Sequence, residues 1–96
     1  MNQYELMVIL EPDLDSQALD RILDNLGSIV SSNDGEVAEV DRWGQRRLAY
    51  EIDGKTEGQY VVVTFKSEED VPREIQRVLN LNESVLRHMI LRTDEE

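Results

Sequence analysis

The chain has 96 residues, of which 40% are hydrophobic and 32% are charged, and its 21 acidic residues against 10 basic ones give a net charge of −11. These values predict a single globular domain, while the lack of cysteine excludes disulfides and thiolate chemistry. The charge also excludes a general nucleic-acid coat, because such proteins bind by neutralising phosphates.

The first half of the chain predicts a strand followed by a helix. Residues 4–10 are apolar on both faces after Glu5 and end before Pro12, which is typical of a central strand. Asp13 and Asp15 then offer helix-capping oxygens. Apolar residues follow at helical spacing until a turn at residues 33–35, and these are Leu19, Ile22, Leu23, Leu26, Ile29 and Val30.

The middle of the chain predicts a β-hairpin. Residues 36–52 alternate like a long strand, and Gly44 lies where we expect a bulge or bend. Glycine-bearing turn signals at residues 53–58 lead to a second clear strand at residues 59–66. Two extended segments joined by a short glycine-bearing loop are typical of antiparallel pairing.

The last third predicts a second helix and a final strand. Residues 67–70 supply capping groups and negative charge, and Pro72 suits a first helical turn. Val71, Ile75, Val78 and Leu79 form the apolar stripe, residues 80–84 end the helix, and residues 85–92 form the strand. Residues 94–96 are a short acidic C-terminal tail.

The order βαββαβ predicts an α+β fold of the ferredoxin-like class. Right-handed crossovers place two helices on one face of a four-stranded antiparallel sheet. We expect one domain over residues 1–93, without a membrane span, an export signal or an internal linker. The expected location is the cytoplasm. The other sheet face, or the edge formed by the second strand, must meet water or a partner.

Catalysis finds little support in the residues. The only histidine, His88, shares a strand face with Leu86 and Ile90 and is interpreted as structural. The acidic segment 10–13 after the first strand would repel a phosphate, and no carboxylates have the spacing of a calcium loop. We therefore expect no cofactor, no metal and no small-molecule substrate.

The segment from Asp41 to Ile52 carries Trp43, Arg46, Arg47 and Tyr50 within an acidic chain. Exposed arginines and aromatic rings together are typical of RNA sites, and equally of protein interfaces. A third interpretation is cross-strand salt bridging to neighbouring carboxylates on an edge protected by charge. The pattern alone leaves these three readings open.

Several stretches in order resemble the bacterial ribosomal protein S six (S6) family of the small subunit. They are residues 4–12, 43–52, 58–60 and 79–90. The resemblance implies a non-enzymatic, ferredoxin-like protein that pairs with ribosomal protein S eighteen (S18). It also implies that the pair binds the central domain of small-subunit ribosomal RNA during assembly. A basic partner would supply the long-range attraction that this acidic chain lacks.

The same resemblance implies contact residues. Arg46 and Arg47 are the first candidates for RNA or partner contact, and the second candidates are Arg87, Trp43, Tyr4 and Arg92. Leu48 and Tyr50 match the family's motif, but we expect them to have packing roles. The alternatives are a protein-only interaction or small-ligand regulatory module on the same fold, and a small hydrolase that would need a nucleophile not visible here.

Overall fold

A computed structural model describes residues 1–94. Its elements follow the predicted order: β1 (Asn2–Leu10), α1 (Ser16–Ser32), β2 (Glu36–Ile52), β3 (Lys55–Ser67), α2 (Val71–Leu81) and β4 (Val85–Arg92). Of the predicted acidic tail, Glu95 and Glu96 lie outside the described residues.

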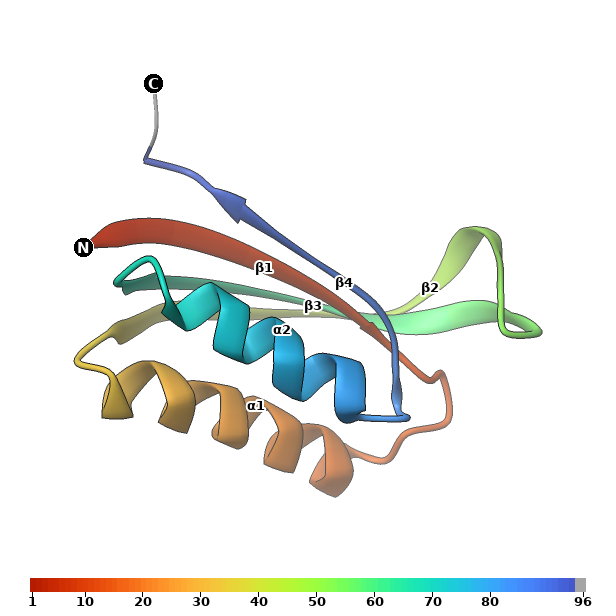
Figure 1. Ribbon diagram of the computed structural model, residues 1–96. Coiled ribbons are helices and arrows are strands. Elements are labelled where there is room, and N and C mark those ends of the chain that lie inside the picture. The colour runs from red at the N-terminus through yellow and green to blue at the C-terminus, as the bar shows by residue number, and fades with distance from the viewer. Residues whose placement is uncertain (95–96) are drawn as a thin grey trace.

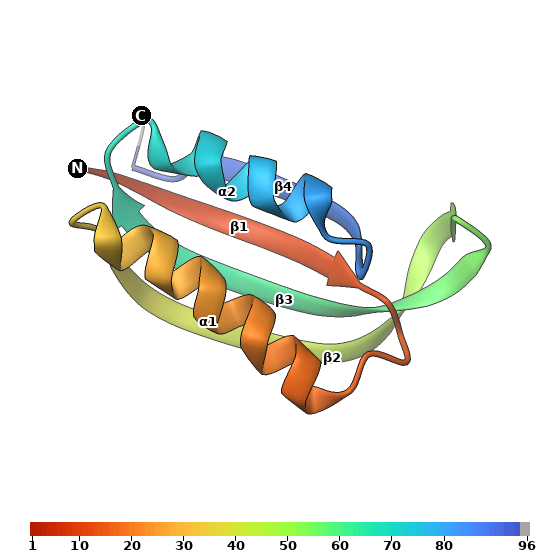
Figure 2. The ribbon, with the colours of Figure 1, turned by 60° about the horizontal axis from the view of Figure 1, so that its bottom comes forward.

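The strands form one antiparallel sheet in the order β2-β3-β1-β4. β1 pairs with both β3 and β4 and is central, as its apolar sequence predicts, whereas β2 and β4 are the two edges. Both helices cover the same face of the sheet, and within residues 1–94 no helix covers the opposite face, which we call the open face (Figure 1, Figure 2). The predicted ferredoxin-like fold is confirmed.

The core lies between the sheet and the helices because alternate strand residues point to opposite faces. On β1 these are Tyr4, Leu6, Val8 and Leu10, which are buried, while Glu5 and Met7 between them are not. The rest of the core comes from β3 and both helices: Val61, Val63, Phe65, Leu19, Leu26, Val30, Val71, Ile75 and Leu79.

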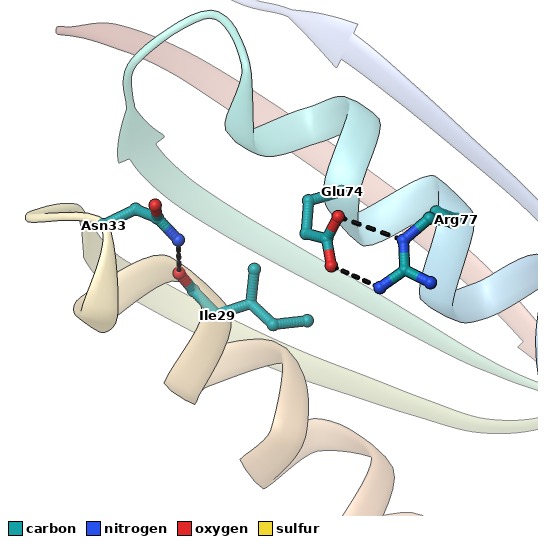
Figure 3. A network of polar contacts seen from close by, with 4 residues as sticks. All are labelled: Ile29, Asn33, Glu74 and Arg77. Atoms are coloured by element: carbon teal, nitrogen blue, oxygen red, sulfur yellow. Dashed lines mark hydrogen bonds and ion pairs between the residues drawn. The ribbon is translucent and has the colours of Figure 1, made fainter.

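The two ends of α1 are held by local side chains. Asp15 accepts a hydrogen bond from the backbone N–H of Ala18 at 2.8 Å, which confirms one of the two predicted caps. At the other end, the Asn33 amide donates to the carbonyl of Ile29 at 2.8 Å (Figure 3). Asp34 then takes a positive φ of 63°, which turns the chain toward β2.

The start of α2 differs from the prediction. Ser67 belongs to β3 and is buried, with its hydroxyl donating to the Glu68 carbonyl at 3.1 Å. Asp70 occupies the cap position, but its side chain makes no capping hydrogen bond, and its backbone is already helical. The predicted role of Pro72 in the first turn is confirmed.

The hairpin is tighter than predicted. Its turn consists of Asp53 and Gly54 alone, with φ values of 48° and 80°, as a two-residue turn of mirror-image type requires. β3 therefore begins at Lys55, and Gly58 lies inside the strand rather than in the loop. The reason for that glycine is close packing: a Cβ at Gly58 would lie 2.6 Å from Cγ2 of Ile9.

β2 is continuous but irregular. Its pairing with β3 shifts between Arg42 and Gly44, where Gly44 has a φ of 81°, so the predicted bulge is confirmed. A larger shift follows between Arg47 and Ile52, because four residues of β2 there oppose the single residue Thr56. We call residues 46–58 the hairpin arm. Figure 1 shows the β2 part of this arm rising away from the helices, toward the open face, before the chain returns into β3.

Candidate nucleic-acid and protein interface on the open face

The open face of the sheet is mixed apolar and acidic. Strand register places Met7 of β1 beside Val62 of β3 and Met89 of β4, and places Glu5 beside Leu91. Met89 and Leu91 are each 50% exposed. Such a surface at the centre of a sheet is typical of a face that meets a protein partner.

Trp43 is fixed flat against this face. Its ring is parallel to that of Tyr60 within 2°, with the ring centroids 6.0 Å apart. Its indole N–H donates to a carboxylate oxygen of Asp41 at 3.0 Å. Because 42% of the side chain is still exposed, the fixed indole ring is accessible to an incoming base, sugar or side chain.

Arg46 and Arg47 lie next to this tryptophan. Together with Asp41, Arg42, Trp43 and Tyr60 they line a groove, which we call the arginine–tryptophan groove. Both arginines are exposed, and neither forms an ion pair among residues 1–94. Glu57 is paired in register with Arg47, but its carboxylate accepts a hydrogen bond from Gln45 instead. Both guanidinium groups therefore remain open to an external anion.

Three other arginines are occupied by carboxylates. Arg42 bonds Asp20 at 2.7 Å, and Arg92 bonds Asp94 at 3.0 Å. Arg77 makes two hydrogen bonds to Glu74, at 3.1 Å and 2.6 Å (Figure 3). The hydrogen bond from Arg77 lowers the pKa of Glu74, and that from Arg92 lowers the pKa of Asp94. These ion pairs stabilise local structure, so we do not count the three arginines as part of a basic binding surface.

Arg87 has a different partner. Its guanidinium carbon lies 5.5 Å from the centroid of the Tyr50 ring, over the ring. Tyr50 is 57% exposed, so the packing role expected for it is wrong, whereas Leu48 is 8% exposed and does pack. Between these groups lies an apolar pocket of about 350 Å³, lined in part by Met7, Ile9, Leu48, Tyr60 and Met89.

Two predicted contact residues do not join this surface. Tyr4 lies on the helix-facing side of β1, so it is only 7% exposed. Its ring stacks on that of Phe65 in the core, with the two ring centroids 5.5 Å apart. Arg92 pairs with Tyr4 at the far end of β4, whereas Arg87 pairs with Ile9 near the hairpin. The structure thus brings together Arg46, Arg47, Trp43 and, through Tyr50, Arg87.

Sequence reasoning missed Tyr60 as a member of the surface, and it gave Tyr50 a packing role although it had singled out Tyr50 together with the arginines. Tyr60 shares its strand face with Val62 and Thr64, so the alternation of β3 contained that signal. The exposure of Tyr50 carried no such signal, because Tyr50 lies within the pairing shift between Arg47 and Ile52, where strand alternation does not give the face of a side chain.

The described residues offer no visible catalytic arrangement. Nε2 of His88 lies 2.8 Å from Oδ1 of Asn80 in α2, so the imidazole is part of the packing between β4 and that helix. Among residues 1–94, no group of three metal-ligating side chains comes together. No helix in this part of the chain is both long and apolar enough to cross a membrane.

Comparison with known proteins gives consistent matches over nearly the whole chain. The family model described as Ribosomal protein S6 matches residues 3–92. A relative from Streptomyces griseus, named small ribosomal subunit protein bS6, is 50% identical over 94 residues, which are 98% of each chain. A relative of the same name from Corynebacterium glutamicum is 50% identical over 95 residues, covering 99% of this chain and 100% of that one.

A solved structure agrees with the fold. The crystal structure of 30S ribosomal protein S6 from Thermotoga maritima superposes with a TM-score of 0.88 over 97% of this chain and 88% of that one. Because the sequence identity is 24%, this similarity shows only that the two proteins share a fold.

Proposed function

Because the chain belongs to the ribosomal protein S6 family, we propose that it binds ribosomal protein S18 and, together with it, the central domain of small-subunit ribosomal RNA during assembly. The chain itself is a structural component of the small ribosomal subunit in the cytoplasm. It acts by binding and is not an enzyme.

The observation that carries the RNA part of the proposal is the arginine–tryptophan groove. Two adjacent arginines, which form no ion pair with any other described residue, lie beside an exposed indole that stacking and a hydrogen bond hold in place. Guanidinium groups bond phosphate oxygens in two-pronged geometry, and aromatic faces stack on unpaired bases or sugars. Arg46 and Arg47 are the proposed phosphate contacts, and Trp43 is the proposed stacking surface.

The net charge of −11 supports a partner of opposite charge. An isolated chain of this charge is repelled by RNA, so its few free arginines act only after a basic protein has supplied the attraction. The apolar residues of the open face, with Glu5 and Asp41 among them, offer both the contact area and the charge complement for that protein.

Replacing Arg46 and Arg47 with alanine tests the assignment. Both side chains are exposed and form no ion pair within the described part of the chain, so we expect the urea unfolding midpoint to change little. Affinity for the RNA in the presence of S18 should fall by roughly tenfold or more, since each desolvated charge-assisted contact contributes about 1.5–3 kcal/mol. The slope of log affinity against log salt should also become shallower.

The matched control removes the same charge elsewhere. Arg21 in α1 and Arg73 in α2 are likewise exposed, form no ion pair within residues 1–94, and lie on the helical side of the molecule. The double variant Arg21→Ala, Arg73→Ala should retain nearly all of the affinity. Equal losses in the two double variants would mean that net charge, and not the groove, governs binding. Binding of S18 without any RNA dependence would favour the protein-only interaction module.

A further inference from the structure

The contact between Tyr50 and Arg87 joins the two edges of the sheet. Tyr50 belongs to β2 and Arg87 to β4, and the sheet order places β3 and β1 between those strands. The hairpin arm must therefore reach across the open face for the ring of Tyr50 to lie beneath the guanidinium. The pairing shift supplies the chain for this, because four residues of β2 oppose one residue of β3 at that point.

The same part of the arm packs against the end of β1. Leu48 is 8% exposed although its neighbours in β2 are exposed. The site of a Cβ on Gly58 lies 3.5 Å from Cδ2 of Leu48 and 2.6 Å from Cγ2 of Ile9. Ile9 and Leu48 therefore occupy the space that a side chain at position 58 would need. In this way Leu48 packs the arm against the end of β1.

The backbone ladder alone does not fix the direction of the arm. Between the pairs Arg47–Glu57 and Ile52–Lys55, the strands are out of step, so side-chain contacts determine where this part of the arm points. Among the described residues, the packing of Leu48 against Ile9 and Gly58 and the cation–π contact of Arg87 with Tyr50 join this part of the arm to the sheet. Arg46 and Arg47 are paired in register with β3 and immediately precede this segment, so the contacts that hold the segment also steady the end of the ladder that carries both arginines beside Trp43.

We propose that Arg87 is a positioning residue: by holding Tyr50 it fixes the hairpin arm across the open face and so steadies Arg46 and Arg47 beside Trp43. It does not itself contact the phosphates. The consequence for binding rests on the proposed function, whereas the contact that holds the arm does not. A cation already placed over an aromatic ring supports this role, because using it on a phosphate would release the arm.

The first test uses the free chain. Amide hydrogen exchange of residues 46–58 is compared among wild type, Arg87→Ala, Tyr50→Leu and the double variant. Each single variant should accelerate exchange in the arm by about two- to fivefold, the equivalent of an exposed cation–π contact, and leave the helices unchanged. The double variant should be no faster than either single one, since both remove the same contact.

Two controls separate the contact from charge and from the hydroxyl group. Tyr50→Phe keeps the ring and should exchange like wild type. Arg73→Ala removes one exposed positive charge from α2 and should also leave the arm unchanged. Arm exchange that is unaffected by Arg87→Ala, or accelerated equally by Arg73→Ala, would overturn the proposal.

The second test repeats the cycle on the complex with S18 and ribosomal RNA. Because Arg87 acts through Tyr50, its replacement should weaken binding about two- to fivefold in wild type and not at all in the Tyr50→Leu background. If binding is insensitive to Arg46 and Arg47 while the exchange cycle behaves as expected, the positioning contact stands and the proposed function fails. If Arg87→Ala weakens binding equally in both backgrounds, Arg87 touches the RNA directly and the positioning role is wrong.

Discussion

Two glycines of this chain have opposite surroundings, and their alanine variants should differ in sign. At Gly58 a Cβ would lie 2.6 Å from Cγ2 of Ile9 and 3.1 Å from the backbone oxygen of Leu10, so Gly58→Ala should lower the free energy of unfolding by about 1–3 kcal/mol. At Gly27, inside α1, nothing lies within 4 Å of the added atom. Gly27→Ala should therefore stabilise the protein by about 0.5–1 kcal/mol, because alanine favours helix.

Urea unfolding of both variants checks this pair. Gly27→Ala is the control for the effect of an extra methyl group. A Gly58→Ala variant as stable as wild type would mean that Ile9 and Leu10 at the end of β1 move aside at little cost in free energy. In that case the tight packing beneath the arm would not be a fixed feature of the fold.

The pair of Glu74 and Arg77 gives a pH dependence with a defined sign. The hydrogen bond from Arg77 lowers the pKa of Glu74 from its ordinary value of 4.5. A carboxylate whose pKa is lowered in the folded state stabilises it above the ordinary pKa, and this contribution is lost as pH falls through the lowered value. Both groups are exposed, so the effect is small.

Comparing wild type with Glu74→Gln at pH 7 and at about pH 3 measures this effect. We expect wild type to be the more stable at pH 7 and the difference to shrink at the lower pH. A difference that stays constant between the two pH values would assign it to helix propensity rather than to the ion pair.

At the scale of elements, the two helices begin differently. Asp15 bonds the backbone N–H of Ala18, whereas the side chain of Asp70 makes no such bond. Asp15→Ala should cost about 1 kcal/mol of stability, while Asp70→Ala should cost only a few tenths of a kcal/mol through its charge near the helix start. Thermal unfolding of the two variants measures the contrast, and equal losses would contradict the difference in capping.

The sequence predicted the elements better than their junctions. Periodicity placed β1, both helices and β4 to within a residue or two, because each buries one regular face. The turn at Asp53 and Gly54 was recognisable, but Gly58 looked like a second turn residue. Its true reason is contact with Ile9, about fifty residues earlier, and no local pattern carries that information.

The candidate site was predictable only in part for the same reason. Adjacent arginines beside a tryptophan are visible in the sequence, and the structure does bring Arg46, Arg47 and Trp43 together. The burial of Tyr4 follows from its place on the helix-facing side of β1. The exposure of Tyr50 follows a pairing shift in β2, and the length of such a shift depends on the partner strand.

At the scale of the whole molecule, charge and topology divide the surface into two sides. The helical side holds the ion pairs of Arg42 with Asp20 and of Arg77 with Glu74. The open side holds Trp43, the exposed Arg46 and Arg47, and the apolar residues of β1 and β4. An acidic chain with one such side suits joint binding with a basic protein better than independent binding to RNA.

Binding of this chain to RNA should therefore depend on S18, and a titration measures that dependence. The full chain is titrated onto a central-domain ribosomal RNA fragment, with and without S18, over a series of salt concentrations. We expect binding only when S18 is present, with a salt slope that Arg46→Ala or Arg47→Ala makes shallower. Equal binding without S18 would show that the chain binds RNA independently, and no binding when both folded proteins are present would rule out joint binding.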